Sequence, residues 1–380
     1  MRISGDWLVR PTTQRLCAVL TEAGHRALFV GGCVRNALLG RAVSDIDLAT
    51  DAVPAAVSAL AAAAGFKVVP TGIDHGTVTV IAGGVPHEVT TFRRDVETFG
   101  RHAVVAFSTD VAEDAARRDF TMNALYAEAS GAVIDPLGGL PDLIARRVRF
   151  VGDPIRRIEE DYLRILRFFR FHAIYGAPDE GLDAEGLAAC AARAEGVAQL
   201  SRERVGAEMR KLLAADDPAR SVASMECAGV LAVVLPGAEA RALPVLVHLE
   251  EGRAPDWLLR LASLGGAEVA DRLRLSRADA AALARLREAA LAGAPPAEQG
   301  YRLGARLGAG AVLLRAALTE TPPPAGWEAA VERGATARFP VAAADLMPAL
   351  AGPALGARLR ALEERWIASD FRLDRAALLD

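Results

Sequence analysis

The chain has 380 residues, more than one ordinary compact domain and ample for a buried core. Hydrophobic residues make up 52% of it, which excludes a disordered chain. The net charge of −4 gives no overall basic character, although nucleic-acid binding depends on where the charges lie.

Three features of the sequence bear on the cellular setting. No apolar run reaches the ~20 residues that span a bilayer, so we expect no membrane contact. Residues 1–10 lack the apolar core of a signal peptide. The cysteines lie far apart without metal-ligand spacing, and we therefore expect a reduced, cytoplasmic location. They are Cys17, Cys33, Cys190 and Cys227.

The first elements lead to a turn that suits an anion. An amphipathic helix is predicted over residues 11–24, and a short apolar strand over 27–30. The strand ends at Gly31-Gly32, where backbone N–H groups can approach a phosphate before the next helix begins. Arg35 follows three residues after Gly32, so this unit can form a triphosphate cradle.

Two carboxylates come next along the chain. Alternate side chains of a strand share a face, so Asp45 and Asp47 point the same way while Ile46 and Leu48 point into the core. Two such carboxylates repel each other unless a cation lies between them. Mg²⁺, held by one or two carboxylates and substrate phosphate oxygens, is the expected ion. The alternative is a solvated strand edge.

Further strands can deliver a third carboxylate. A helix is predicted over 53–64 and a strand over 66–69, followed by paired strands over 77–81 and 88–92. Glu88 begins the last of these, where a neighbouring strand can bring it to the aspartate pair. The polar residues 93–105, with Gly100-Arg101-His102, are expected to form an exposed loop.

A charged segment and a long helix follow. Arg117, Arg118 and Asp119 precede a helix predicted over 120–125, and by themselves fit the charged face of a helix. Residues 156–171 predict one strong helix with an apolar stripe at helical spacing. On another side of it Asp161 and Arg164 can form an ordinary i,i+3 salt bridge or recognise a ligand together.

Beyond residue 151 the pattern predicts helices alone, with no convincing catalytic motif. Ser201 is expected to cap a helix that runs to residue 213, and Asp216-Asp217-Pro218 to break the chain. The later predicted helices span 219–229, 241–252, 255–264, 268–274, 277–292, 299–319, 325–334 and 354–368. Mixed elements followed by helices only indicate at least two domains.

Several motifs in the first 215 residues resemble those of tRNA CCA-adding enzymes and the related bacterial poly(A) polymerases. GG-x-V-R-x-x-L-L-G followed by D-x-D is similar to their nucleotidyltransferase signature, R-R-D-F-T-x-N-A to a second motif, and E-D-x-x-R to a third. The strand E-x-T-T-F-R and the segment R-x-D…G-R-H also agree with that family. One departure is Asn36, where the family usually has Asp.

The resemblance implies a role for each candidate residue. It implies that Asp45 and Asp47 bind the metal and that Glu88 is a third acidic residue beside them. Arg118 would contact the nucleotide's phosphate and Asp119 its sugar. Asp161 and Arg164 would read the base edge, with Glu160 orienting Arg164. The implied nucleotide-binding set is Gly31, Gly32, Arg35, Arg118, Asp119, Glu160, Asp161, Arg164, Arg167 and Arg170.

The resemblance also implies the domains and the fold. An α/β nucleotidyltransferase head with a DNA polymerase beta-like mixed sheet is expected over residues 1–147. An all-helical neck for base recognition is expected over 148–215, and a helical body and tail that bind tRNA over 216–380. Residues 93–105 would be the flexible loop of the complete CCA-adding enzymes.

The implied reaction is template-independent addition of C, C and A to the 3′ end of tRNA, from CTP and ATP with Mg²⁺. No obligate protein partner is evident. Three alternatives remain: a poly(A) polymerase, an enzyme that adds only part of the CCA end, and an RNA-binding protein with an inactive head. Tyr162 favours a CCA-adding enzyme, because poly(A) polymerases usually have Pro there.

Overall fold

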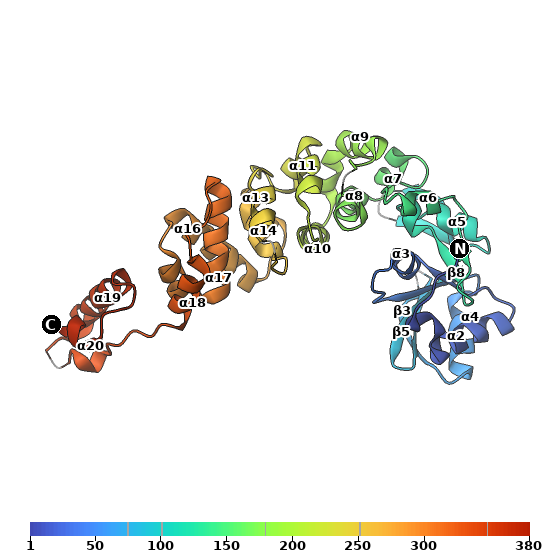
Figure 1. The fold of residues 1–380 in the computed structure, drawn as a ribbon. Coiled ribbons are helices and arrows are strands. Elements are labelled where there is room, and N and C mark those ends of the chain that lie inside the picture. The colour runs from blue at the N-terminus through green and yellow to red at the C-terminus, as the bar shows by residue number, and fades with distance from the viewer. Residues whose placement is uncertain (74–75, 100–101, 179, 251, 348) are drawn as a thin grey trace. The chain divides into compact units, whose positions relative to one another are not determined.

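The computed structural model describes residues 1–73, 76–99, 102–178, 180–250, 252–347 and 349–380 (Figure 1). The chain forms two compact units. One contains residues 1–201 and 227–233, and the other contains residues 202–226 and 234–380. The expected boundaries near residues 147 and 215 stay predictions.

A seven-stranded mixed sheet forms the centre of the first unit, in the order β3-β4-β5-β2-β1-β8-β9. β2 and β5 run parallel, whereas the other neighbouring pairs run antiparallel. The strands are β1 (Leu28–Val30), β2 (Ile46–Thr50), β3 (Lys67–Gly72), β4 (Thr77–Ala82), β5 (Val85–Thr91), β8 (Tyr126–Glu128) and β9 (Val133–Ile134). This confirms the mixed α/β head and the predicted pairing of β4 with β5.

Helices cover the sheet and bury their apolar faces against its strands. α2 (Pro11–Glu22) and α4 (Pro54–Ala63) pack against each other and against β4. Each begins with proline, which needs no hydrogen-bond partner at the first helical position. Leu16 and Leu20 of α2 are fully buried, as is Ala61 of α4. α1 (Asp6–Val9) precedes them and α3 (Gly32–Leu38) joins β1 to β2.

The described residues on either side of Gly100 and Arg101 form paired strands, so the exposed loop predicted over 93–105 is wrong for residues 93–99 and 102–105. β6 (Arg93–Phe99) and β7 (His102–Phe107) make a separate two-stranded antiparallel sheet, with Phe99 opposite His102. A ladder of backbone hydrogen bonds needs no apolar face, so polar composition did not reveal it. Gly100 and Arg101, which the sequence placed in the loop, lie outside the described residues.

The helix predicted over residues 120–125 is also wrong. α5 (Val111–Ala116) ends before that segment, and only a single 3₁₀ turn, η2 (Thr121–Asn123), follows. Tyr126 pairs with Val30 in the sheet, so the chain must become extended there. A short helix, α6 (Leu140–Ile144), follows the last strand of this sheet.

The long helix predicted over residues 156–171 is two helices. α7 (Pro154–Glu160) ends at Asp161, which is extended with φ −156° and ψ 104°, and α8 (Leu163–Tyr175) follows. The Asp161 carboxylate accepts a hydrogen bond from the backbone N–H of Leu163 at 3.1 Å, which stabilises the start of α8. Tertiary packing and this hydrogen bond override the continuous helical pattern. The unit continues with α9 (Ala184–Ala192) and η3 (Ala194–Gln199).

An aromatic cluster connects these segments to the sheet. The Phe120 ring lies 5.0 Å from Phe150 and 4.9 Å from Phe171, measured between centroids. Phe168 stacks on Phe150 at 5.3 Å. All four side chains are buried. Phe120, Phe150 and α8, which carries Phe168 and Phe171, therefore share one core.

The second unit contains helices and no named strand within its described residues. Its helices are α10 (Arg202–Leu213), α11 (Ala219–Cys227), α13 (Ala242–Leu249), α14 (Trp257–Leu264), α15 (Val269–Arg272), α16 (Arg277–Ala292), α17 (Pro296–Thr319), α18 (Trp327–Thr336), η4 (Ala343–Asp345), α19 (Gly352–Ala368) and α20 (Arg375–Leu379). α12 (Val230–Val234) belongs largely to the first unit. The predicted switch from mixed elements to helices is confirmed.

A buried ion pair fixes the start of the second unit. Arg260 of α14 is 2% exposed, and its Nε donates to Glu250 Oε2 at 2.7 Å. Its other nitrogens donate to the carbonyl oxygens of Leu213 and Asp216 at the end of α10.

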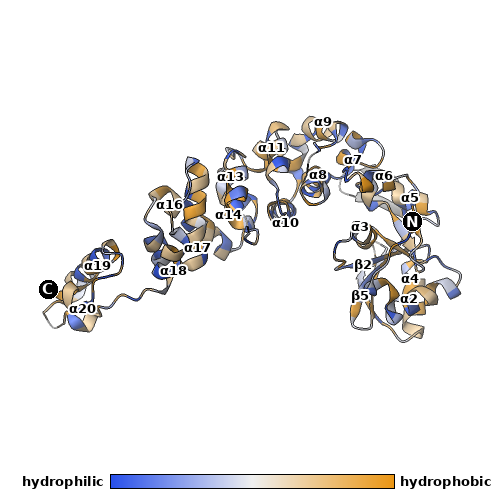
Figure 2. Ribbon diagram, viewed as in Figure 1, coloured by the Kyte–Doolittle hydropathy of each residue, from blue (hydrophilic) through white to orange (hydrophobic). Residues whose placement is uncertain are grey.

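The helices of the second unit carry hydrophobic and hydrophilic residues together (Figure 2). No helix of the described chain is long and apolar enough to cross a membrane.

Candidate active site

The predicted cradle begins at a glycine that the backbone requires. Gly31 joins β1 to α3 with φ 69° and ψ −118°, a conformation that other residues rarely adopt. A Cβ there would lie 3.3 Å from Nη1 of Arg118. α3 begins at Gly32, directly after Gly31. Gly31 therefore brings the backbone close to the Arg118 guanidinium.

The three predicted acidic residues lie at neighbouring positions of the sheet. Asp47 of β2 and Glu88 of β5 are register partners in the parallel pair, and Asp45 immediately precedes β2. Ile46 and Leu48 are buried, whereas Asp47 is half-buried and Glu88 is exposed. The alternation predicted for β2 is confirmed, and the sheet places Glu88 beside Asp47.

The surroundings of Asp47 oppose its negative charge. Burial, followed by the charge of Glu88 and the smaller effect of Asp45, raises its pKa from 3.8 to about 6, although Arg118 lowers it. A divalent cation would relieve this crowding, and carboxylate oxygens are the ligands that Mg²⁺ prefers. Asp45 and Asp47 therefore fit a metal. The described chain contains no group of three or more His, Cys, Asp or Glu side chains placed to hold an ion, so the fit concerns this pair of carboxylates alone.

Arg118 is held by an acidic and a phenolic partner. Its Nη2 donates to Asp114 Oδ2 at 3.0 Å and its Nε to the Tyr126 hydroxyl at 3.0 Å. Burial alone would lower the pKa of Arg118, but these two partners raise it above its usual value. The remaining nitrogen, Nη1, lies beside Gly31. A charged donor is thus fixed at the predicted phosphate position.

Asp119 has protein partners for both carboxylate oxygens. Oδ1 accepts from the Phe120 backbone and from Asn123 Nδ2, and Oδ2 accepts from Arg167 Nε at 2.7 Å and Nη2 at 2.5 Å. Burial would raise the pKa of Asp119, but Arg167 and Asn123 hold it below its usual value. A carboxylate has about four acceptor positions. Here Asp119 positions Arg167, and a sugar hydroxyl would have to share or displace these bonds.

Arg35 lies inside the site and bonds to protein groups. It is 7% exposed, and Nη1 donates to Asn123 Oδ1 at 2.5 Å. Nη2 donates to the Tyr175 hydroxyl at 2.6 Å, while Nε and Nη2 both donate to Asn36 Oδ1. Burial lowers the pKa of Arg35. The structure therefore uses every nitrogen of Arg35 to connect α3, η2 and α8.

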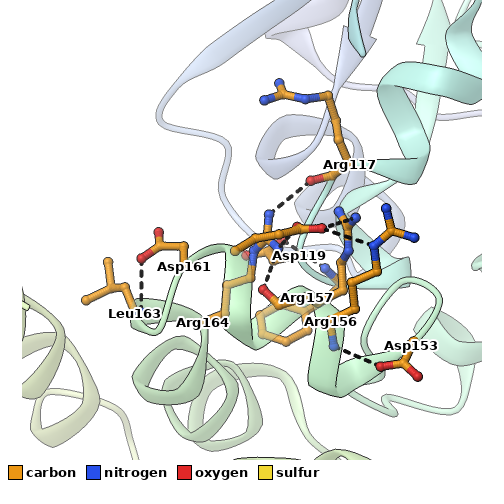
Figure 3. Close-up of polar contacts among 10 residues, drawn as sticks. Arg117, Asp119, Asp153, Arg156, Arg157, Asp161, Leu163 and Arg164 are labelled. Atoms are coloured by element: carbon orange, nitrogen blue, oxygen red, sulfur yellow. Dashed lines mark hydrogen bonds and ion pairs between the residues drawn. The ribbon is translucent and has the colours of Figure 1, made fainter. Parts of the chain in front are cut away.

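Asp161 and Arg164, the pair expected to read the base, have a different geometry from the one predicted. Asp161 lies in the break between α7 and α8, so it does not share one helix with Arg164 (Figure 3). Arg164 Nη1 donates to Glu160 Oε2 at 2.6 Å, and Nη2 donates to the Arg117 carbonyl at 3.2 Å. Glu160 makes the contact with Arg164 that an orienting role requires. It also accepts from Arg157 Nη2.

Three arginines surround one aromatic ring near the middle of α8. The guanidinium carbons of Arg35, Arg167 and Arg170 lie 5.2, 5.3 and 4.7 Å from the Phe171 ring centroid. Cation–π contacts of this kind favour positive charge over the ring face. The predicted residues Arg167 and Arg170 thus lie together with Arg35.

Some residues of this network were not singled out from the sequence. Asn123 bridges Arg35 and Asp119, and it is the Asn of the R-R-D-F-T-x-N-A motif, which is the signal that could have identified it. Tyr175 bonds to Arg35 although 140 positions separate them. No local pattern marks such a contact.

Two protein families match parts of the chain. Residues 27–149 match the family described as the poly A polymerase head domain, and residues 182–241 match the family described as a probable RNA and SrmB-binding site of polymerase A. The first match covers the glycine turn, the acidic residues and Arg118.

Curated relatives give a consistent result. A CCA-adding enzyme of Bacillus pumilus is 44% identical over 196 residues, which are 51% of this chain and 47% of that relative. The mitochondrial CCA tRNA nucleotidyltransferase 1 of Homo sapiens is 42% identical over 200 residues, 52% of this chain and 46% of the relative. The chain thus spans about half the length of the curated relatives that it matches.

Solved structures extend the likeness over nearly the whole chain. The CCA-adding enzyme of Bacillus stearothermophilus in complex with CTP is 29% identical, with a TM-score of 0.71 over 94% of this chain and 93% of that one. The Thermotoga maritima CCA-adding enzyme complexed with tRNA is 19% identical, with a TM-score of 0.71 over 99% and 97%. The latter likeness concerns the fold alone. The chain belongs to the nucleotidyltransferase family of class II CCA-adding enzymes and poly(A) polymerases.

Proposed function

We propose that this chain adds C, C and then A to the 3′ end of tRNA without a nucleic-acid template. CTP and ATP would be the donors and pyrophosphate the leaving group. CCA-adding enzymes similar to this chain have been solved with CTP, with ATP and with tRNA, which supports these substrates.

One observation carries the proposal. Asp47 and Glu88 are opposite each other on neighbouring parallel strands, with Asp45 one residue before β2. The Arg118 guanidinium is near enough to Asp47 to lower its pKa, and it also lies beside the Gly31 turn. Acidic groups next to a fixed cationic donor suit the transfer of a nucleotidyl group from a triphosphate.

Enzymes of this family are generally metal-dependent, and we take Mg²⁺ as the ion. Asp45 and Asp47 would hold it, with Glu88 as a further acidic group. A bound Mg²⁺ lowers the pKa of a hydroxyl nucleophile and stabilises a leaving pyrophosphate. Arg118 would bind the phosphates by charge-assisted hydrogen bonds. Asp119 would keep Arg167 directed towards the nucleotide.

Base choice would come from the break between α7 and α8. Cytosine and adenine both present an amino donor beside a ring-nitrogen acceptor, which suits a carboxylate and an arginine. Asp161 would accept from the amino group, and Arg164, held by Glu160, would donate to the ring nitrogen. Arg167 and Arg170 would contact the same nucleotide.

The structure offers one observation that bears on the poly(A) alternative. Tyr162 follows Asp161 in the break, and a Cβ at Gly196 of η3 would lie 2.0 Å from its ring. The tyrosine thus has a specific place in the neck, where poly(A) polymerases usually have Pro. This favours the CCA-adding reaction over polyadenylation.

Nucleotide incorporation tests the proposal. Purified protein is incubated with Mg²⁺, tRNA lacking its CCA end, and labelled CTP or ATP. We expect CTP incorporation alone to give two added residues, and ATP incorporation to depend on prior CTP addition. Long adenosine tails would indicate a poly(A) polymerase, products ending in CC a partial enzyme, and no incorporation an inactive head.

A further inference from the structure

The link between α3 and β2 carries an exposed arginine next to the neck. Arg41 lies four residues before Asp45, and its guanidinium carbon is 5.2 Å from the Tyr175 ring centroid at the end of α8. Its backbone N–H donates to the Asn36 carbonyl at 2.8 Å. A side chain that is anchored at both ends in this way is directed rather than freely mobile.

The Tyr175 ring contacts two arginines, of which one is buried and the other is exposed. Arg35 is buried, lies 4.0 Å from the ring centroid and donates to the Tyr175 hydroxyl. Arg41 is exposed, and its guanidinium has no hydrogen bond or ion pair to another residue in the described part of the chain. Arg35 therefore holds Tyr175, and Tyr175 supports a guanidinium whose donors face solvent.

Asn36 explains how the link is fixed. Its Oδ1 accepts from Arg35, while its Nδ2 donates to the Ala42 carbonyl at 2.9 Å. The arginine contact settles which end of the amide is oxygen. The aspartate usual at this position could accept from Arg35 but could not donate to a carbonyl. In this chain Asn36 holds both Arg35 and the segment that carries Arg41.

We propose that Arg41 is a binding site for a phosphate of the RNA acceptor strand, supported by Tyr175 and Asn36. The inference rests on the proposed function. An arginine fork suits phosphate, and Arg35, Arg167 and Arg170 lie nearby, although Asp119 balances the charge of Arg167.

The position favours RNA over the incoming nucleotide. α3 has seven residues, so Arg41 lies beyond the end of a helix of ~10 Å whose start is the proposed triphosphate turn. Arg164 and Tyr175 are ~16 Å apart along α8, which separates Arg41 from the proposed base site as well. Four residues of chain place Arg41 within ~14 Å of Asp45. The strand that ends at the reacting 3′ hydroxyl can pass this point.

The test compares Arg41→Gln with a matched control. Arg15→Gln also removes an exposed arginine over an aromatic ring, since Arg15 lies 5.7 Å from the Phe66 centroid, but on α2. The KM for tRNA lacking CCA and the KM for CTP are measured from about 50 to 200 mM salt. Thermal melting shows that each variant is folded.

We expect Arg41→Gln to raise the KM for tRNA by roughly tenfold at low salt and to reduce the salt slope by about one. Its KM for CTP and the behaviour of Arg15→Gln should equal those of the wild type. Arg41→Lys should keep the salt slope, because the charge remains. Tyr175→Leu should raise the KM for tRNA by a smaller factor, because the guanidinium loses its support.

An unchanged KM for tRNA and an unchanged slope in folded Arg41→Gln would overturn the inference. A change in the KM for CTP alone would also overturn it, because the phosphate would then belong to the nucleotide. These outcomes leave the proposed function standing. The proposed function fails instead if the wild-type protein incorporates no CTP.

Discussion

Asp47 is charged at a position where folding favours a neutral group. Burial and the nearby Glu88 and Asp45 raise its pKa to about 6. At pH values below 3.8, the ordinary pKa, the carboxyl group is neutral in both the folded and the unfolded state, and it does not lower the free energy of unfolding. At pH values above about 6 the group is charged in both states, and the full loss of stability appears. This contribution to the free energy of unfolding falls as pH rises through that window. A carboxylate that lowers the stability of the metal-free protein indicates a ligand, here a cation, whose binding offsets that loss.

Asp47→Asn should separate the two effects. In the metal-free protein at pH 7 to 8 the variant should melt at a higher temperature than the wild type, and the difference should shrink towards pH 4. Nucleotide incorporation should fall by orders of magnitude, because the charge is needed for the metal. Mg²⁺ should raise the melting temperature of the wild type only. A variant with normal incorporation would rule out the metal assignment.

Asp161 provides the second prediction at this scale. Asp161→Ala should fold and should incorporate UTP or GTP relatively more often. Both bases offer a carbonyl where the amino group is needed, and facing it with a carboxylate loses a hydrogen bond worth roughly 1–3 kcal/mol. The measurement is the ratio of CTP to UTP incorporation. An unchanged ratio in a folded variant would mean that Asp161 serves only to stabilise the start of α8.

Among the elements, the break between α7 and α8 has the clearest physical cause. Asp161 accepts from the first backbone N–H of α8, and the adjacent Tyr162 ring fills a space that only glycine leaves at position 196. Neither contact can be read from helical periodicity, because η3 lies more than 30 residues further along the chain.

Gly196→Ala should therefore destabilise the neck. Its Cβ would lie 2.0 Å from the Tyr162 ring, and overpacking of this kind costs about 1–3 kcal/mol. Tyr162→Ala should lose ring packing by itself, but the double variant should be more stable than the sum of the two changes predicts. Urea unfolding of the four proteins measures this coupling. Simple additivity would show that the two side chains do not meet.

The ribbon of β6 and β7 gives the other prediction for an element. Replacing residues 98–103 by a two-residue turn should keep C addition and impair A addition, so that tRNA products end in CC. The prediction comes from the likeness of this segment to the loop of complete CCA-adding enzymes. Product sequencing measures the effect. A shortened ribbon that still completes CCA would refute a role in A addition.

The sequence predicted the parts of the site that depend on local pattern. Alternation predicted that Ile46 and Leu48 of β2 are buried while Asp47 is not, and the strand that contains Glu88 was also predicted, although it begins at Val85 rather than at Glu88. The environment of Arg35 was not predictable, because Tyr175 and Asn123 reach it from distant parts of the chain. The same holds for Asp119, whose Oδ2 accepts from Arg167, 48 positions further along the chain.

For the whole molecule, net charge says little about the partner. The chain carries a net charge of −4, yet Arg35, Arg167 and Arg170 surround a single ring at Phe171. Local charge of this kind suffices for phosphate binding. The family match covers the head and part of the helices, while the curated relatives match over about half their length. The activity of the chain therefore has to be measured directly.

The most direct measurement is the 3′-terminal sequence of tRNA that lacks CCA after reaction with all four nucleoside triphosphates and Mg²⁺. Asp45→Asn, which keeps the shape of the side chain, is the control for the metal site. We predict that the wild type adds C, C and A and then stops, and that the variant adds nothing. Unlimited adenosine addition, random incorporation, or equal products from Asp45→Asn would contradict the account.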